Sequence, residues 1–213
     1  MRSRLGSCDA CVARARAVLG DAGVAATYNA AMLDIALKEW QAVCTALVTG
    51  RQCILLRKGG IHEVEGKFEL ETSKFLLFPT YLHQNIDWIK SADRALADPK
   101  SAEPETIQIP GYATVEHIWQ VHSREQMDRL DAAHIYLPPL IDMRFNYKPH
   151  NPLYLMLLRA YRFPNAPTVT NTPAYAGCRS WVPLESPIDI ASATPAINDD
   201  EFHLARDRVA AVF

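Results

Sequence analysis

The chain has 213 residues, of which 49% are hydrophobic and 22% charged, and its formal net charge is −2. This is an ordinary globular composition, large enough to bury a sizeable core without disulfides or structural metals, and the near-neutral charge excludes a protein that binds nucleic acid through a strong overall positive charge. No apolar run approaches the roughly 20 residues that a membrane-spanning helix requires, so we expect no membrane segment.

The first 31 residues differ from the rest of the chain. They are rich in Ala, Arg and Gly, and Arg14 and Arg16 interrupt their one candidate helix. They also lack the apolar core of a secretory signal. We therefore expect residues 1–31 to be a poorly structured extension, explained either by a misassigned start codon, with Met32 as the true initiator, or by a real extension that packs poorly.

The cysteines indicate a reducing, cytoplasmic location. They are odd in number and lie at positions 8, 11, 44, 53 and 178. Cys8 and Cys11 form a CxxC pair without a second close pair, so a zinc site would need distant ligands. Cys44 and Cys53 lie in apolar patterns typical of buried thiols. Cys178 as a nucleophile would need a nearby base, and a packing role is the favoured alternative.

Residues 33–48 predict the first helix of the domain. Apolar side chains recur there at helical spacing, and Gly50 follows where a C-terminal cap would lie. On this helix Glu39 would lie on an apolar flank, where a buried carboxylate needs a partner. We expect an ion pair with Arg57 or Lys58, and a role for Glu39 as a catalytic acid is the alternative.

The next segment predicts a buried strand that ends in a cationic turn. Residues 53–56 are a continuous apolar run, typical of a strand covered on both faces, and Arg57, Lys58, Gly59 and Gly60 follow directly. Two cations beside backbone amides that glycine leaves exposed could bind a phosphate or a carboxylate. An ordinary tight turn at a charged strand end gives the same pattern.

Residues 63–71 alternate strictly between charged and other residues. On one strand, Lys67 and the carboxylates Glu63, Glu65, Glu69 and Glu71 would share a face. That face could bind a divalent metal, and Glu65 with Lys67 has the acid-x-lysine spacing of restriction-type nucleases. A solvated outer face of an antiparallel strand is the alternative and is favoured.

A third group of polar residues closes the apolar segment that ends at Pro79. His83 and Gln84 follow it, and His83 could act as a general base or a ligand, although a lone histidine is more often structural. We expect His83 or Gln84 to form a second wall of an anion site whose first wall is residues 57–60.

The remaining elements follow from local patterns. We expect a helix over residues 85–97, a surface loop over 97–105, strands over 112–122 and 153–158, and a turn at 177–181 that enters a last strand. Capping boxes predict helices opening at Ser123 and at Asn198, and a proline pair predicts one opening at Pro138. Arg159 would continue the buried face of its strand and seek a carboxylate.

Several separated blocks resemble one family. ALKEW at 36–40, RKGGI at 57–61, LFPTYLHQ at 77–84, NPLYLMLLRAYRF at 151–163 and GCRSWVPL at 177–184 occur in one order. Together they are similar to the bacterial family known as domain of unknown function 1802. The family has no established activity, and the similarity of some members to chains fused with restriction-endonuclease domains implies a restriction or defence context.

These expectations combine into one fold and two functions. The fold is α+β: an N-terminal helix followed by a mixed, largely antiparallel sheet with helices packed on it, in a single domain over 32–213 or in two lobes joined at 97–105. The first function is a nucleic-acid-associated protein, with a metal-dependent phosphodiesterase using Glu39, Glu65, Lys67 and Glu71. The second is a non-catalytic module in which Arg57, Lys58, Gly59, Gly60, His83 and Gln84 bind an anionic ligand, a nucleotide or a partner protein. A cofactor is implied only by the first function, as a divalent metal with undetermined ligands.

Overall fold

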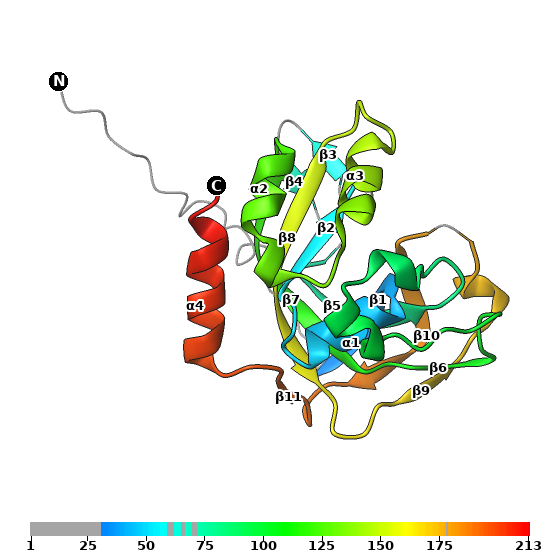
Figure 1. The fold of residues 1–213 in the computed structure, drawn as a ribbon. Coiled ribbons are helices and arrows are strands. Elements are labelled where there is room, and N and C mark those ends of the chain that lie inside the picture. The colour runs from blue at the N-terminus through cyan, green and yellow to red at the C-terminus, as the bar shows by residue number, and fades with distance from the viewer. Residues whose placement is uncertain (1–30, 59–61, 65–66, 70–71, 178) are drawn as a thin grey trace. The chain divides into compact units, whose positions relative to one another are not determined.

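The computed structural model describes residues 31–58, 62–64, 67–69, 72–177 and 179–213, which belong to one compact unit over Ala31–Phe213 (Figure 1). The fold is α+β, as predicted, and its centre is a seven-stranded mixed sheet. Across the sheet the strand order is β10 (Trp181–Asp189), β1 (Met32–Trp40), β5 (Lys74–Thr80), β7 (Gly111–Val121), β8 (Leu153–Arg162) and β11 (Thr194–Pro195), and β2 (Ile54–Arg57) also pairs with β8. Strands β1 and β5 run parallel, and the other paired strands among the described residues are antiparallel.

Smaller elements complete the unit. Two two-stranded ribbons pair β3 (His62–Val64) with β4 (Lys67–Glu69) and β6 (Thr106–Gln108) with β9 (Thr168–Thr170). The α-helices are α1 (Gln41–Val48), α2 (Arg124–Arg129), α3 (Pro138–Asn146) and α4 (Asp199–Ala210). The 3-10 helices are η2 (Ile86–Trp88), η3 (Ser91–Leu96), η4 (Asp131–Ala133) and η5 (Pro173–Tyr175). None of the described helices is long and apolar enough to cross a membrane.

The helix predicted over residues 33–48 is wrong in its first half. Met32–Trp40 is strand β1, and only Gln41–Val48 is helical. Strand β1 lies between β5 and β10, and its residues Ala36 and Leu37 are buried. Because a strand covered on both faces needs no alternation of apolar and polar residues, its sequence can imitate the helical spacing. Gly50 does follow the helix with a φ of 74°, as the predicted cap requires.

The single alternating strand predicted over residues 63–71 is also wrong. Strands β3 and β4 form an antiparallel pair in which Glu63 lies opposite Phe68 and Val64 opposite Lys67. The segment therefore forms two short paired strands and not the one continuous strand that the alternation predicted. Gly59, Gly60, Glu65, Glu71 and Cys178 lie outside the described residues.

Other elements agree with the sequence. Strands β7 and β8 are present, and both capping boxes form, at Ser123 with Gln126 and at Asn198 with Glu201. Helix α3 begins at Pro138, as predicted. The helix expected over residues 85–97 is instead η2 and η3, because Ile89 between them makes an isolated β-bridge to Tyr136.

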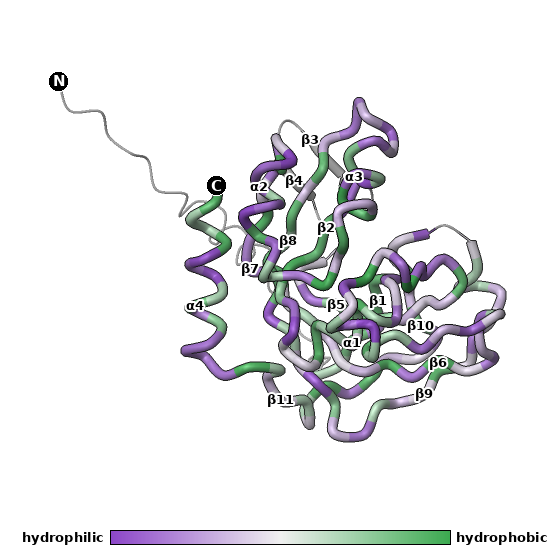
Figure 2. The backbone as a smooth tube through the Cα atoms, viewed as in Figure 1, coloured by the Kyte–Doolittle hydropathy of each residue, from purple (hydrophilic) through white to green (hydrophobic). Residues whose placement is uncertain are grey.

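Two hydrophobic cores flank the sheet. The larger one joins α1 and α3 to β2, β5 and β8, and the smaller one lies beneath the β6–β9 ribbon and η5. Most of β2 is hydrophobic in Figure 2, whereas α4 alternates between polar and apolar segments, since it buries only Phe202 and Val209. Strands β1 and β2 are not neighbours in the sheet, yet their side chains meet on the side of the larger core, where the candidate site begins.

Candidate functional site

A buried ion pair links the ends of β1 and β2. Arg57 Nη1 lies 2.9 Å from Glu39 Oε2, and the two residues are 8% and 6% exposed. The other carboxylate oxygen accepts a hydrogen bond from the backbone N–H of Trp40 at 2.9 Å. The predicted pair is therefore present, although Glu39 reaches it from a strand and not from a helix. Both carboxylate oxygens of Glu39 are engaged, which leaves it poorly placed to bind a metal or to donate a proton.

Further polar side chains surround this pair. Gln52 donates a hydrogen bond from Nε2 to the Tyr136 hydroxyl at 2.9 Å, and its Oε1 accepts the backbone N–H of Ile135. Burial, and then the charge of Glu39, raise the pKa of the Tyr136 hydroxyl well above its usual value. The same two causes raise the pKa of the Cys44 thiol, so neither group supplies an anionic nucleophile. The hydrogen bonds of Gln52 and Tyr136 therefore stabilise the ends of β1 and β2.

Gln84 lies at the start of α1, on the same side as Arg57. Its Oε1 accepts the backbone N–H of Ala42 at 2.7 Å and so caps the helix. Thr80 Oγ1 donates to the Glu39 carbonyl at 3.1 Å, which ties the end of β5 to the same junction. The neighbouring His83 is exposed. The structure thus brings Gln84 near the Glu39–Arg57 pair in a structural role and places His83 on the surface.

Lys58, which follows Arg57 in the sequence, has different neighbours. Adjacent residues at a strand end point to opposite faces, and Lys58 lies away from Glu39. It is 8% exposed, and Nζ donates to the Phe145 carbonyl at 2.5 Å. No carboxylate among the described residues pairs with it. Burial lowers the pKa of the Lys58 ammonium.

A polar cavity of about 430 Å³ opens beside Lys58. Its wall is formed by the end of β7, the turn before β8 and the end of α3. The polar lining side chains are Lys58, Gln120, His122, His150 and Asn151. None of the described lining residues is Asp or Glu, so among them an anion that enters meets hydrogen-bond donors without a repelling carboxylate.

The turn that precedes the lining residues His150 and Asn151 carries an exposed aromatic ring. Tyr147 is 53% exposed, and Lys148 Nζ lies 5.4 Å from the ring centroid. Lys148 has a φ of 45°, a left-handed conformation that no other described non-glycine residue adopts. A non-glycine residue held in this conformation is found disproportionately at functional sites. The turn from Tyr147 to Asn151 therefore combines a strained backbone, a cation and a surface ring.

Arg144 adds a further cationic group near this region. Its Nε is buried without a hydrogen-bond partner among the described residues, and its charge influences the ionisation of Tyr136. Arg57 and Arg144 thus both lie near Tyr136, together with the Glu39 carboxylate. The local charge is positive in a protein whose net charge is −2.

The phosphodiesterase hypothesis requires a cluster of side chains that binds a divalent metal, and the described residues contain no such cluster. No group of three or more His, Cys, Asp or Glu side chains that could hold a metal occurs among the described residues. Lys67 lies on β4, and Glu65 and Glu71 lie outside the described residues.

Arg159, expected to be buried, pairs with Asp199 of α4 and packs over the Phe202 ring at 4.8 Å.

Sequence reasoning missed most of the cavity wall. Gln120 and His122 end the predicted strand over 112–122, and His150 and Asn151 precede the predicted strand over 153–158. The register of β7 on β8 places Val121 opposite Leu153, so these two ends meet. The antiparallel pairing of these two strands could have been predicted from the sequence. That pairing would have brought Gln120, His122, His150 and Asn151 together.

Comparisons with known proteins identify the family and one distant similarity. The family model described as domain of unknown function (DUF1802) matches residues 36–208. No curated protein matches the chain. The crystal structure of ASCH from Zymomonas mobilis has 12% identity and a TM-score of 0.39, with 83% of this chain and 93% of that chain covered. A variant of that protein with one serine-to-alanine substitution has 11% identity and a TM-score of 0.40, with 81% and 94% covered. A similarity of this size transfers no functional residue to this chain.

Proposed function

The chain belongs to the family described as domain of unknown function 1802, which supplies no activity, and from its own geometry we propose that it is a binding module for a phosphate-bearing ligand. The binding site is the cavity beside Lys58. The observation that carries the proposal is Lys58, a residue only 8% exposed that lines the cavity and has no carboxylate partner among the described residues. A buried charge is costly unless it is paired, and a bound anion would provide the partner.

The other polar residues that line the cavity favour a phosphate group as the ligand over the carboxylates of a partner protein. Gln120, His122, His150 and Asn151 supply several hydrogen-bond donors, enough for the three terminal oxygens of a phosphate. The exposed Tyr147 ring, in the turn just before the lining residues His150 and Asn151, offers a stacking surface for a base, the usual companion of phosphate contacts in the binding of single strands. These features support the nucleic-acid association expected from the sequence, with a nucleotide as the smaller form of the same ligand.

Lys58 also has a structural role, which the test must separate from binding. Its hydrogen bond to the Phe145 carbonyl satisfies an acceptor near the end of α3. In Lys58→Met the loss of this bond is offset by removal of a buried charge, so we expect the free energy of unfolding to change by less than about 1 kcal/mol. Binding of a phosphate ligand, in contrast, should weaken about tenfold, the usual effect of losing one charged hydrogen bond.

The experiment is a titration of the full chain with mononucleotides, short single-stranded DNA and short single-stranded RNA, at low and at physiological salt. Lys100→Met is the matched control, because Lys100 lies in the exposed loop 97–105, where it pairs with Asp98 at 3.0 Å. We expect Lys58→Met alone to weaken binding, and added salt to weaken binding to the wild type. Equal binding by Lys58→Met and the wild type would refute the proposed site.

The phosphodiesterase hypothesis makes a different prediction in the same assay. Cleavage of the nucleic acid that requires a divalent metal and is lost in Glu65→Gln or Glu71→Gln would establish an enzyme and replace the binding module. Binding without cleavage, in the presence and in the absence of the metal, supports the module.

A further inference from the structure

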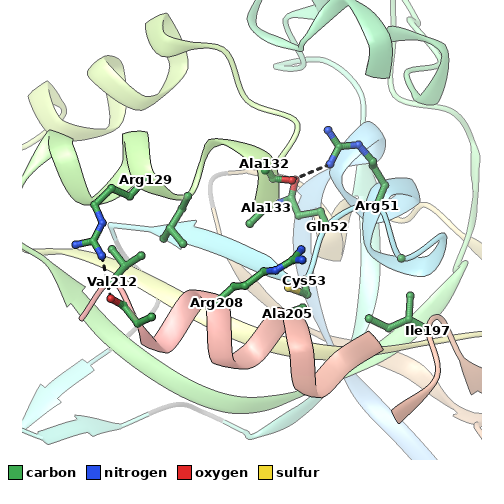
Figure 3. Close-up of a pocket in the computed structure, with 13 residues that line it drawn as sticks. Arg51, Gln52, Cys53, Arg129, Ala132, Ala133, Ile197, Ala205, Arg208 and Val212 are labelled. Carbon is green, nitrogen blue, oxygen red and sulfur yellow. Dashed lines mark hydrogen bonds between the residues drawn. The ribbon is translucent and has the colours of Figure 1, made fainter. Parts of the chain in front are cut away.

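A second cavity, of about 490 Å³, lies at the opposite end of β2 from Lys58 (Figure 3). Its walls come from three segments: residues 50–53 before β2, residues 129–133 of α2 and η4, and α4 with the residues that follow it. Each segment contributes one arginine, namely Arg51, Arg129 and Arg208. The Arg208 side chain extends from α4 toward Cys53, with Arg51 and Arg129 on either side (Figure 3).

The charges of the three arginines are compensated to different extents. Arg51 makes a two-bond ion pair with Asp93, at 2.6 and 2.8 Å, so its charge is neutralised. Arg129 donates one hydrogen bond to the Ala211 carbonyl at 2.9 Å, and it has no ion pair with a described residue. Arg208 has neither a hydrogen bond nor an ion pair with any described residue. Asp207, the nearest carboxylate along α4, pairs instead with Arg206 at 2.8 Å.

Apart from Gln52, the remaining side chains of the described lining are largely apolar. Leu130, Ile197, Ala205 and Val212 are among them, and none of the described lining residues is Asp or Glu. A volume of roughly 300–1,000 Å³ with an apolar lining and a few convergent charged groups is typical of a small-molecule site. Two uncompensated guanidinium groups match the charge of a phosphomonoester, which is about −1.5 to −2 at neutral pH, and arginine binds phosphate through paired N–H groups.

We propose that this arginine cavity, defined by Arg51, Arg129 and Arg208, binds a small organic phosphomonoester. The phosphate contacts Arg129 and Arg208, and the apolar or aromatic part of the ligand lies against Leu130, Ile197 and Val212. The site is separate from the Lys58 cavity, because the two lie at opposite ends of β2 and share no lining residue. It is also tied to the position of α4, which supplies Arg208 and, just after its end, the Ala211 carbonyl that holds Arg129.

The test uses phenyl phosphate as the probe, with inorganic phosphate and phenol as its two separate parts. Binding is measured by calorimetry in the Lys58→Met chain, so that the other cavity does not contribute. We expect phenyl phosphate to bind more tightly than either part, and Arg208→Ala to weaken it at least about tenfold, as the loss of a charged hydrogen bond predicts.

Arg206→Ala is the matched control, since it removes the same charge from the same helix at a residue that does not line the cavity. It should leave the affinity within about twofold. The proposal is overturned by any of three results: no saturable binding of phenyl phosphate, equal binding by Arg208→Ala and the parent, or an equal loss in Arg206→Ala. Binding of phenol as tight as that of phenyl phosphate would also overturn it, because the site would then recognise only the ring.

Discussion

At the scale of single residues, the buried Glu39–Arg57 pair sets the clearest expectation. Glu39→Gln removes the negative charge and leaves the Arg57 guanidinium buried without compensation. We expect the free energy of unfolding to fall by roughly 3 kcal/mol, the usual cost of breaking a buried pair from one side. Chemical denaturation of the purified variant measures this change directly.

Two further variants test the cause. Arg57→Met added to Glu39→Gln removes the uncompensated cation and should recover much of the lost stability. Glu125→Gln, on an exposed residue of α2, should change the stability by less than about 0.5 kcal/mol. If the double variant is no more stable than Glu39→Gln alone, the charge of Arg57 is not the source of the loss.

His134 makes stability depend on pH. Its ring is buried, and burial, together with the charge of Lys90, lowers the pKa of His134 from 6.5 to about 4. Asp131 and the Met127 carbonyl act in the opposite direction and are outweighed, and Nε2 has no partner among the described residues. Between pH 6.5 and about 4 the unfolded chain therefore binds a proton that the folded chain does not.

This difference in bound protons determines the direction in which stability changes with pH. Stability is full above about pH 6.5, falls as the pH drops toward 4, and receives no further contribution from His134 below that value. The slope is at most about 1.4 kcal/mol per pH unit, so the total loss is roughly 3 kcal/mol. Urea denaturation at several pH values measures it, and His134→Asn should flatten the curve while keeping an acceptor for the Tyr136 N–H. A curve of unchanged shape in that variant would assign the pH dependence to other groups.

At the scale of elements, the junction after α1 depends on a glycine. Gly50 has a φ of 74°, and a Cβ there would lie 2.2 Å from Ile197 Cγ2. Gly50→Ala should therefore cost about 2–4 kcal/mol, from both the left-handed backbone and the displacement of Ile197. Gly177 is a matched control, because it has a φ of 80° and no atom within 4 Å of an added Cβ. Gly177→Ala should cost only about 1 kcal/mol, and equal costs in thermal denaturation would show that the Ile197 contact is unimportant.

The elements also show where sequence patterns suffice and where they do not. Helices α2, α3 and α4 were predicted because their starting signals, two capping boxes and a proline pair, are local in sequence. Strand β1 was mistaken for a helix because its burial comes from β5 and β10, which lie far along the chain. The ion pair of Glu39 was predicted in spite of this error, since a carboxylate among apolar residues needs a partner in either conformation. Lys58 was singled out from the sequence, whereas the His and Asn residues that line its cavity were not, because they meet through strand pairing.

At the scale of the whole molecule, the described unit contains its own hydrophobic cores. The described residues of both cores come after Ala31, and the Ala31 carbonyl accepts the backbone N–H of Ile190. We expect removal of residues 1–30, with Ala31 retained, to shift Tm by less than roughly 4 °C, which corresponds to about 1 kcal/mol for a chain of this size. Differential scanning calorimetry of the shortened and full chains makes the comparison. A larger fall would show that the first 30 residues stabilise the fold.

The place of β1 between β5 and β10 has a consequence for synthesis of the protein. β1 emerges first from the ribosome, but its partner β10 begins only at Trp181, on the order of ten seconds of translation later. During that interval β1 can pair with β5 on one side, while the other side presents unpaired backbone groups to neighbouring nascent chains and to chaperones. A ribosome that stops before β10 releases a chain whose sheet ends at an open, largely apolar strand, and such fragments are substrates for aggregation and for quality control.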